Sequence, residues 1–153
     1  MAAIDVHRAK LFGRCEARNG IASFDRLVEQ VMTQAPYRTA KRVFWILDNG
    51  SSHRGQACIT RLQSRYTNLV VVHAPVHASW LNQIEIYFSI LQRKLLTLND
   101  FKSLKELEQQ LMAFQGYYEQ IAKPFEWKFT REDLTALLKK LKSASLTTER
   151  LAA

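Results

Sequence analysis

The fold is decided by residues 43–96, which open with Val43-Phe44-Trp45-Ile46-Leu47-Asp48-Asn49-Gly50-Ser51-Ser52-His53. The same stretch closes with His77-Ala78-Ser79-Trp80-Leu81-Asn82-Gln83-Ile84-Glu85, which leads into a long amphipathic segment. One carboxylate, Asp48, therefore follows an apolar run, and another, Glu85, lies one turn into an expected helix. Folds that bind divalent metal ions between acidic side chains bring two carboxylates together in this way.

The composition indicates one basic, globular domain. The chain has 153 residues, of which 47% are hydrophobic and 24% charged, as is typical of a soluble protein. The net charge of +8 and the pI near 9.7 favour a polyanionic partner such as nucleic acid. Residues 1–76 hold 11 basic and 5 acidic side chains, against 11 and 9 in residues 77–153, so we expect the basic surface in the first half.

Cysteine usage and hydropathy indicate a soluble chain. Cys15 and Cys58 match no metal or redox spacing, and we expect both as reduced thiols in a cytosolic protein. The first residues have no apolar core of signal-peptide length, and no apolar run approaches the ~20 residues of a membrane span.

The first half of the chain predicts a hairpin, a helix and two further strands. Residues 2–6 and 10–15 are joined too closely for a crossover helix, which predicts an antiparallel pair. Residues 21–32 carry one apolar stripe at helical spacing, and Pro36 ends that helix. Residues 43–47 lack polar alternation, which predicts a central parallel strand covered on both faces. A helix over residues 55–66 then leads to a second buried strand over 69–72.

The second half predicts three helices. The first begins near Trp80, with these residues inward: Leu81, Ile84, Phe88, Leu91 and Leu95. Ser103-x-x-Glu106 is a capping box before a helix with the stripe Leu104, Leu107, Leu111 and Phe114. Thr130-x-x-Asp133 resembles a cap for a last helix with Leu134, Leu137, Leu138 and Leu141. We expect one α/β domain over residues 1–142 and a disordered tail over 143–153.

Asp48 and Glu85 are the candidate metal ligands. Asp48 stands at the carboxyl end of a predicted parallel strand, where such sheets bind ligands, although Asp-Asn-Gly is also a turn signal. Glu85 lies at the edge of its helix's apolar stripe, where a carboxylate is costly unless it is hydrated, paired or bound to metal. Taken together, the two acids predict a divalent-metal site for phosphoryl transfer, with a solvated rim acid at position 85 as the alternative.

Other polar residues flank these two acids. We expect His53 to touch phosphate or to orient a water, and Asn82 to hydrogen-bond near the site, with a loop or capping role as the equal alternative for each. Arg54, Arg93 and Lys94 suit contacts with DNA phosphates, although solvated helix faces look the same. Trp80 reads as a packing anchor rather than a base-stacking platform. The absence of a Gly-rich P-loop and of a cysteine ligand set argues against nucleotide hydrolysis and zinc binding.

These motifs carry a resemblance to a known family. Trp45-Ile-Leu-Asp-Asn-Gly-Ser-Ser-His53, followed by His73-Ala-Pro-x-His-Ala-Ser-Trp-Leu-Asn-Gln-Ile-Glu85, resembles DDE transposases, most closely the mariner-like group of bacterial insertion sequences. The resemblance runs from about Ala3 to Leu138. It implies a ribonuclease H-like mixed sheet with flanking helices, shared with retroviral integrases.

The resemblance also implies an activity and a site. The activity is DNA strand cleavage and joining in transposition, with two Mg²⁺ or Mn²⁺ ions, on transposon ends and target DNA. Asp48 matches the second acid of the family's triad and Glu85 the third, with Asn49, His53, Trp80 and Asn82 as supporting residues. It further implies a bacterial, cytoplasmic, nucleoid-associated protein without a membrane partner, which assembles with itself or with a full-length transposase.

The first acid of the triad has no match in this chain. Asp5 is the only acid nearby, and it falls in the predicted hairpin. The chain therefore resembles the back part of a transposase that lacks its first, central strand, and the missing strand would leave two open sheet edges that invite pairing. We expect that the chain alone self-associates or is unstable.

Two other functions stay open at this point. The chain could be an inactive remnant that binds DNA or blocks the full-length transposase. A phosphoacceptor domain of the response-regulator type, with Asp48 as the acceptor, is a third reading, which the hairpin start and the residue 80–85 block disfavour.

Overall fold

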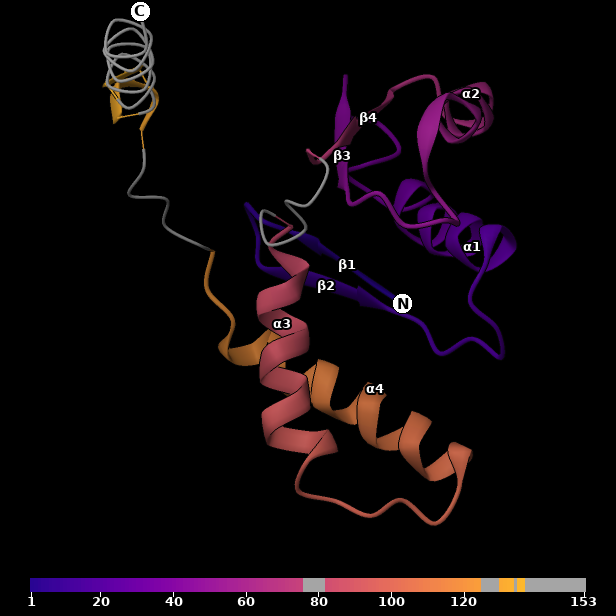
Figure 1. The fold of residues 1–153 in the computed structure, drawn as a ribbon, viewed down its shortest axis with the longest axis vertical. Coiled ribbons are helices and arrows are strands. Elements are labelled where there is room, and N and C mark those ends of the chain that lie inside the picture. The colour runs from indigo at the N-terminus through magenta and orange to yellow at the C-terminus, as the bar shows by residue number, and fades with distance from the viewer. Residues whose placement is uncertain (76–81, 125–129, 134, 137–153) are drawn as a thin grey trace, which may run out of the picture.

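The computed structural model describes residues 1–75, 82–124, 130–133 and 135–136. Two small sheets and the helices packed on them make up this part of the chain (Figure 1). The mixed α/β class predicted from the sequence is confirmed. Within the described residues, no helix combines the length and apolar character needed to cross a bilayer.

The first sheet is the predicted antiparallel hairpin. Strand β1 (Ala2–Asp5) pairs with β2 (Lys10–Gly13), with Ala3 opposite Phe12. Ala9, in the turn, has a φ of 53°. The second sheet is the predicted parallel pair: β3 (Val43–Leu47) runs beside β4 (Leu69–His73), with Trp45 opposite Val71.

One layer of helices joins the two sheets. Helix α1 (Ile21–Met32) buries its predicted stripe, and α2 (Gly55–Arg65) forms the crossover between β3 and β4. Their apolar side chains share one core with residues of β2, β3 and β4, including Phe12, Phe24, Leu27, Val28, Trp45, Leu47, Leu62 and Leu69. This core is what holds the two sheets together, since no backbone ladder connects them.

The other helices pack on the opposite face of the hairpin. Helix α3 (Ile84–Leu91) continues as a π-helical turn, η2 (Gln92–Leu96), and α4 (Leu104–Ile121) follows. Their second core includes Leu11, Ile84, Tyr87, Leu91 and Leu95. The hairpin therefore lies between two helix layers, as Figure 1 shows.

The predicted burial of the parallel strands on both faces is wrong. Trp45 and Leu47 are buried, at 8% and 6% exposure, but Phe44 and Ile46 are 62% and 54% exposed. The reason is the position of the helices: α1 and α2 cover one face, whereas α3 and α4 pack on the hairpin. The other face of β3 and β4 therefore presents apolar side chains to solvent.

The second half differs from prediction in detail. Ser103 caps α4 as expected, with its Oγ accepting from the Glu106 N–H at 3.2 Å. Leu104, placed in the apolar stripe, is 85% exposed. The Thr130–Asp133 cap forms, with the Asp133 N–H donating to Thr130 Oγ1 at 3.2 Å. Trp80, Leu81 and the apolar positions of the predicted last helix lie outside the described residues, as does the predicted tail.

Candidate metal and DNA site

Asp48 directly follows β3 and is held by its own loop. Its Oδ1 lies 2.5 Å from His53 Nε2 and accepts from the Gly50 N–H at 3.1 Å. The hydrogen bond with His53 is the main cause that holds the pKa of the Asp48 carboxyl below its usual value; burial opposes it, and the Gly50 N–H adds to it. Asp48 is therefore a carboxylate at neutral pH, and among the described residues no hydrogen bond occupies its Oδ2.

His53 is fixed on both sides of its ring. Ser52 Oγ lies 2.9 Å from His53 Nδ1, and the ring of Phe24 packs on the imidazole with 4.6 Å between centroids. When the Ser52 hydroxyl donates to Nδ1, the proton of the ring sits on Nε2 and is donated to Asp48. His73 Nε2 donates to the His53 carbonyl at 2.7 Å. His53 thus orients the carboxylate, and its expected contact with phosphate or water stays a prediction.

Gly50 makes this arrangement possible. A Cβ at position 50 would lie 2.9 Å from two atoms of the His53 ring and 3.1 Å from Asp48 Oδ1. The Asn49 side chain faces elsewhere: its Nδ2 donates to the Ala74 carbonyl at 2.8 Å and ties the loop to the end of β4. Asn49 is therefore a structural support of the loop after β3.

Glu85 lies in the first turn of α3, and its side chain is exposed. Asn82 lies two residues before the helix: its carbonyl accepts from the Glu85 N–H at 3.1 Å, and its Oδ1 accepts from the Ile84 N–H at 3.4 Å. These two hydrogen bonds connect Asn82 to the first turn of α3. No hydrogen bond from another described residue reaches the Glu85 carboxylate, which sits at the positive end of the helix dipole.

A single cavity of about 1530 Å³ brings the two candidate acids to one space. Asp48, His53, Asn82 and Glu85 all line it. Carboxylates with free oxygens are the donors that Mg²⁺ or Mn²⁺ takes, and these two acids fit part of such a site. The described residues hold no group of three or more His, Cys, Asp or Glu side chains placed to bind a metal ion.

Asp5 also lines this cavity, but its oxygens are engaged elsewhere. It accepts hydrogen bonds from Tyr37 Oη at 2.6 Å, from the backbone N–H groups of His7 and Arg8, and from Arg8 Nη1 at 3.2 Å. Burial raises the pKa of this carboxyl, and the bonds from Tyr37, His7 and Arg8 together lower it below its usual value. The oxygens of Asp5 are therefore occupied by the hairpin turn and by Tyr37.

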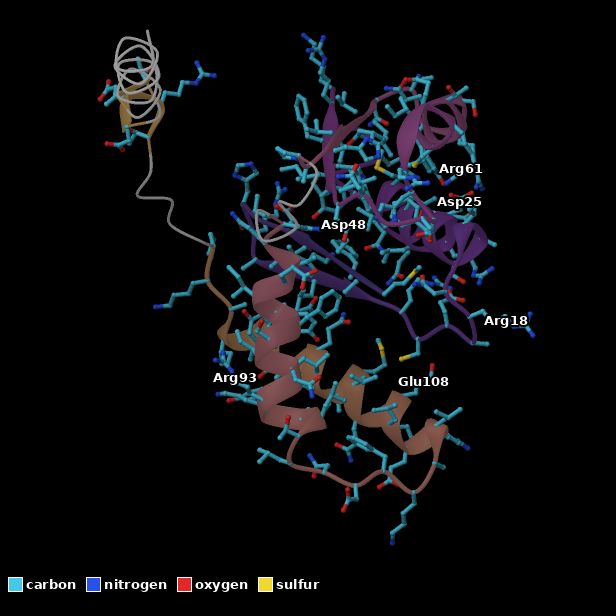
Figure 2. All side chains as sticks on the ribbon, viewed as in Figure 1. Arg18, Asp25, Asp48, Arg61, Arg93 and Glu108 are labelled. Carbon is cyan, nitrogen blue, oxygen red and sulfur yellow. The ribbon has the colours of Figure 1, made fainter. Side chains whose placement is uncertain are left out.

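The basic residues divide into paired and unpaired sets. Arg8, Arg14, Arg26, Arg61 and Arg65 form ion pairs with nearby acids. Arg54, Arg93 and Lys94 are exposed and have no salt bridge within the described part of the chain. Figure 2 places Arg93 on the α3–η2 helix, well away from Asp48. The three bases are therefore exposed to solvent and not engaged in salt bridges with the described acids.

Two residues that contact His53 were not predicted from the sequence to belong to the site. Phe24 reads from the sequence as one more apolar position on α1, and Ser52 as a turn residue. Ser52 is 8% exposed and Phe24 is 4% exposed. Only the packing of α1 against the loop after β3 brings both to His53. Trp80, the remaining expected site residue, lies outside the described residues.

Comparison with known proteins gives one family match. A family model described as DDE superfamily endonuclease matches residues 1–108, more than half of the chain. No curated protein and no solved structure matches the chain. The matched region contains β1 to η2, and with them Asp48, His53 and Glu85. The chain therefore belongs to the DDE superfamily of endonucleases.

Proposed function

We propose that this chain is the catalytic portion of a transposase of the mariner-like bacterial insertion-sequence group, which cleaves and joins DNA strands. The observation that carries the proposal is the pair of carboxylates, Asp48 and Glu85, on one cavity in a chain of the DDE endonuclease family. The residues flanking the pair match the transposase motifs quoted from the sequence.

Asp48 and Glu85 would hold Mg²⁺ or Mn²⁺ at the scissile phosphate. The metal supplies charge neutralisation at the attacking and leaving oxygens when it is bound. His53 donates to Asp48 Oδ1 and so leaves Oδ2 for the metal, while Gly50 admits the imidazole without a clash. Asn82 orders the first turn of α3 and thereby fixes where the Glu85 side chain begins.

DNA binding would use the unpaired bases. Arg54, which precedes α2, and Arg93 and Lys94 on η2 are exposed, and phosphate contacts from such side chains supply affinity without sequence readout. The first carboxylate of the family triad has no match among the described residues, because the oxygens of Asp5 are engaged by Tyr37 and by the hairpin turn. We propose that it comes from a segment outside residues 1–153 or from another polypeptide.

The test is nicking of supercoiled plasmid in Mn²⁺ by the purified chain. The active-site variant is Asp48→Asn, and the matched control is Asp100→Asn, an exposed carboxylate that does not line the cavity. Nicking that Asp48→Asn abolishes and Asp100→Asn retains supports a working site. Nicking that survives in Asp48→Asn would contradict the assignment.

A second candidate is an inactive remnant that inhibits the full-length transposase. The observation in its favour is that the described residues hold no group of three or more His, Cys, Asp or Glu side chains that could bind a metal ion. It predicts no nicking by any variant and a dose-dependent loss of transposition when the chain is titrated into a transposition assay. An unchanged transposition rate would exclude it.

A further inference from the structure

Arg61 of α2 connects α1 with the loop after β3. Its Nε donates to Asp25 Oδ1 of α1 at 3.1 Å, and its Nη2 donates to the Ser52 carbonyl at 3.3 Å. The side chains of Arg61 and Asp25 meet between α1 and α2 (Figure 2). They are largely shielded from water, with 27% of the Arg61 side chain and 16% of the Asp25 side chain exposed. One guanidinium therefore joins two helices to the loop that carries Asp48.

The hydrogen bond to the Ser52 carbonyl fixes a peptide unit. The peptide bond between Ser52 and His53 is planar, so the orientation of its carbonyl also sets the orientation of its N–H. At the other end of this unit, the His53 N–H donates to the Gly50 carbonyl at 3.1 Å. The unit is thus held by Arg61 on one side and by Gly50 on the other.

The next peptide unit is held as well. The His53 carbonyl accepts from His73 Nε2 of β4 at 2.7 Å. Because both peptide units that flank His53 are held, the direction of its Cα–Cβ bond is set, and the ring reaches Asp48 Oδ1 with one nitrogen and Ser52 Oγ with the other. Within the part of the chain that the structure describes, Arg61 and His73 are the side chains from outside residues 48–53 that donate to the backbone of this loop.

Helix α1 contacts the same loop a second time. Phe24, the neighbour of Asp25, packs on the His53 ring with 4.6 Å between centroids. Adjacent helical positions point in directions about 100° apart, so the two residues reach different parts of the loop. Phe24 sets the tilt of the imidazole, while Asp25 acts on the backbone through Arg61.

The second base beside Asp25 does not reach the loop. Arg65, one helical turn after Arg61, has its Nη1 3.9 Å from Asp25 Oδ2, and 46% of its side chain is exposed. Among the described residues, no hydrogen bond joins Arg65 to the loop after β3. Both arginines place a positive charge beside Asp25, but only Arg61 also binds the Ser52 carbonyl.

We infer that Arg61 is a positioning residue that orients the imidazole of His53, and through it the Asp48 carboxylate, by holding the backbone of the loop. Its importance for metal binding rests on the proposed function, whereas the order that it gives to the loop does not. The guanidinium is a planar fork, and it serves Asp25 and the carbonyl at the same time. A lysine ammonium, which is a compact point charge, does not replace it in this geometry.

The experiment compares Arg61→Gln and Arg61→Lys with Arg65→Gln, a matched control that removes a charge beside the same Asp25. The first readout is the pair of ring-nitrogen chemical shifts of His53 in the metal-free chain at one fixed pH, which report how the two nitrogens are hydrogen-bonded. We expect Arg65→Gln to keep the native shifts. Both Arg61 variants should move them toward the averaged values of a mobile, solvated imidazole.

The second readout is the Mn²⁺ affinity from calorimetric titration. Both Arg61 variants should bind Mn²⁺ about tenfold more weakly than the native chain, because groups that orient a metal ligand typically change the affinity by about 10–100-fold. Arg65→Gln should bind Mn²⁺ as tightly as the native chain. Arg61→Lys keeps the positive charge beside Asp25, and a cooperative melt of this variant separates loss of position from loss of the fold.

Native His53 shifts in both Arg61 variants would overturn the inference, whatever the metal affinity. Equal changes in Arg65→Gln would do the same, because they would show an effect of charge alone. A displaced ring with unchanged Mn²⁺ affinity would also contradict it, since Asp48 would then not depend on His53. If the native chain binds no Mn²⁺, the proposed function fails, while the His53 shifts still decide the role of Arg61.

Discussion

The Nε2 of His53 lies 2.5 Å from the Oδ1 of Asp48, five residues earlier in the chain. The contact orders one oxygen of the carboxylate, and no hydrogen bond within the described part of the chain engages the other. His53 is itself positioned by Ser52 and by the ring of Phe24. The loop after β3 is therefore preorganised by side chains that do not themselves need to touch DNA.

Replacing His53 with alanine should raise the pKa of Asp48 toward its ordinary value of 3.8, because the largest cause of the lowered pKa is lost. A carboxyl whose pKa is lowered by folding stabilises the fold above its unfolded pKa, and this stabilisation is lost as pH falls through the folded pKa. In His53→Ala, the stabilisation that Asp48 contributes above about pH 4 should therefore shrink, and so should the loss of stability on acidification that Asp48 causes. Carboxyl titration by NMR measures this, with His7→Ala, an exposed turn histidine, as the control. An unshifted Asp48 pKa in His53→Ala would show that the contact is absent in solution.

Gly50→Ala should disrupt the contact between His53 and Asp48 without removing either side chain. The new methyl group would lie 2.9 Å from the His53 ring, which is packed on Phe24 and must move. We expect a loss of about 1–3 kcal/mol in the free energy of unfolding. Gly116 lies at an exposed position of α4, and no atom lies within 4 Å of a carbon added there. Gly116→Ala should therefore stabilise the fold by about 0.5–1 kcal/mol. Denaturant melts of both variants decide this, and a stable Gly50→Ala would contradict the close approach.

Tyr37→Phe should change the pH dependence of stability. Burial, and then the bond to Asp5, raise the pKa of Tyr37, while the Asp5 pKa is lowered. A raised tyrosine pKa stabilises the fold below the unfolded pKa near 10, and that contribution is lost as pH rises through the folded pKa.

In Tyr37→Phe, the loss of folding stability at alkaline pH that Tyr37 causes should disappear. The loss of folding stability at acid pH that Asp5 causes should become smaller. At neutral pH the variant should lose about 1–3 kcal/mol, because the Asp5 side chain is only 9% exposed and forfeits a donor. Chemical melts from acid to alkaline pH measure this. Tyr117→Phe, 56% exposed, is the control and should leave the profile unchanged.

Asp48→Asn and Glu85→Gln should each weaken Mn²⁺ binding, by about tenfold or more if each carboxylate is a direct ligand. Both substitutions keep the size of the side chain and remove its charge. Calorimetric titration of Mn²⁺ into the chain gives the affinity, with Asp100→Asn as the matched control. Equal affinity in all three variants would refute the site assignment.

Phe44→Lys should reduce self-association. The face of β3 and β4 opposite α1 and α2 presents Phe44, Ile46 and Val72 at 62%, 54% and 43% exposure, and apolar patches of this kind associate in water. A lysine there adds charge to the patch without changing the backbone ladder. Sedimentation at increasing concentration compares the variant with Leu98→Lys, which replaces a loop residue 72% exposed. A native chain that stays monomeric and melts cooperatively would contradict the expectation from the sequence.

The sequence by itself determined the elements and the chemical class of the site. The hairpin, α1 and the parallel pair lie within a residue or two of their predicted bounds, because period and turn residues are local signals. The acids Asp48 and Glu85 were found because their positions after an apolar strand and at a helix start are also readable locally, and the family match covers both.

The tertiary structure alone decided which groups meet. The spacing of apolar residues along a strand or a helix indicates which side is buried, but not which other element covers that side. The exposure of Phe44 and Ile46 was therefore not predicted. The contacts of His53 with Phe24, and of Asp5 with Tyr37, join positions 29 and 32 residues apart in the chain and depend on packing. The separation of the two sheets around one cavity is likewise a property of the packed helices, since no local pattern records which strand edges lack a neighbour.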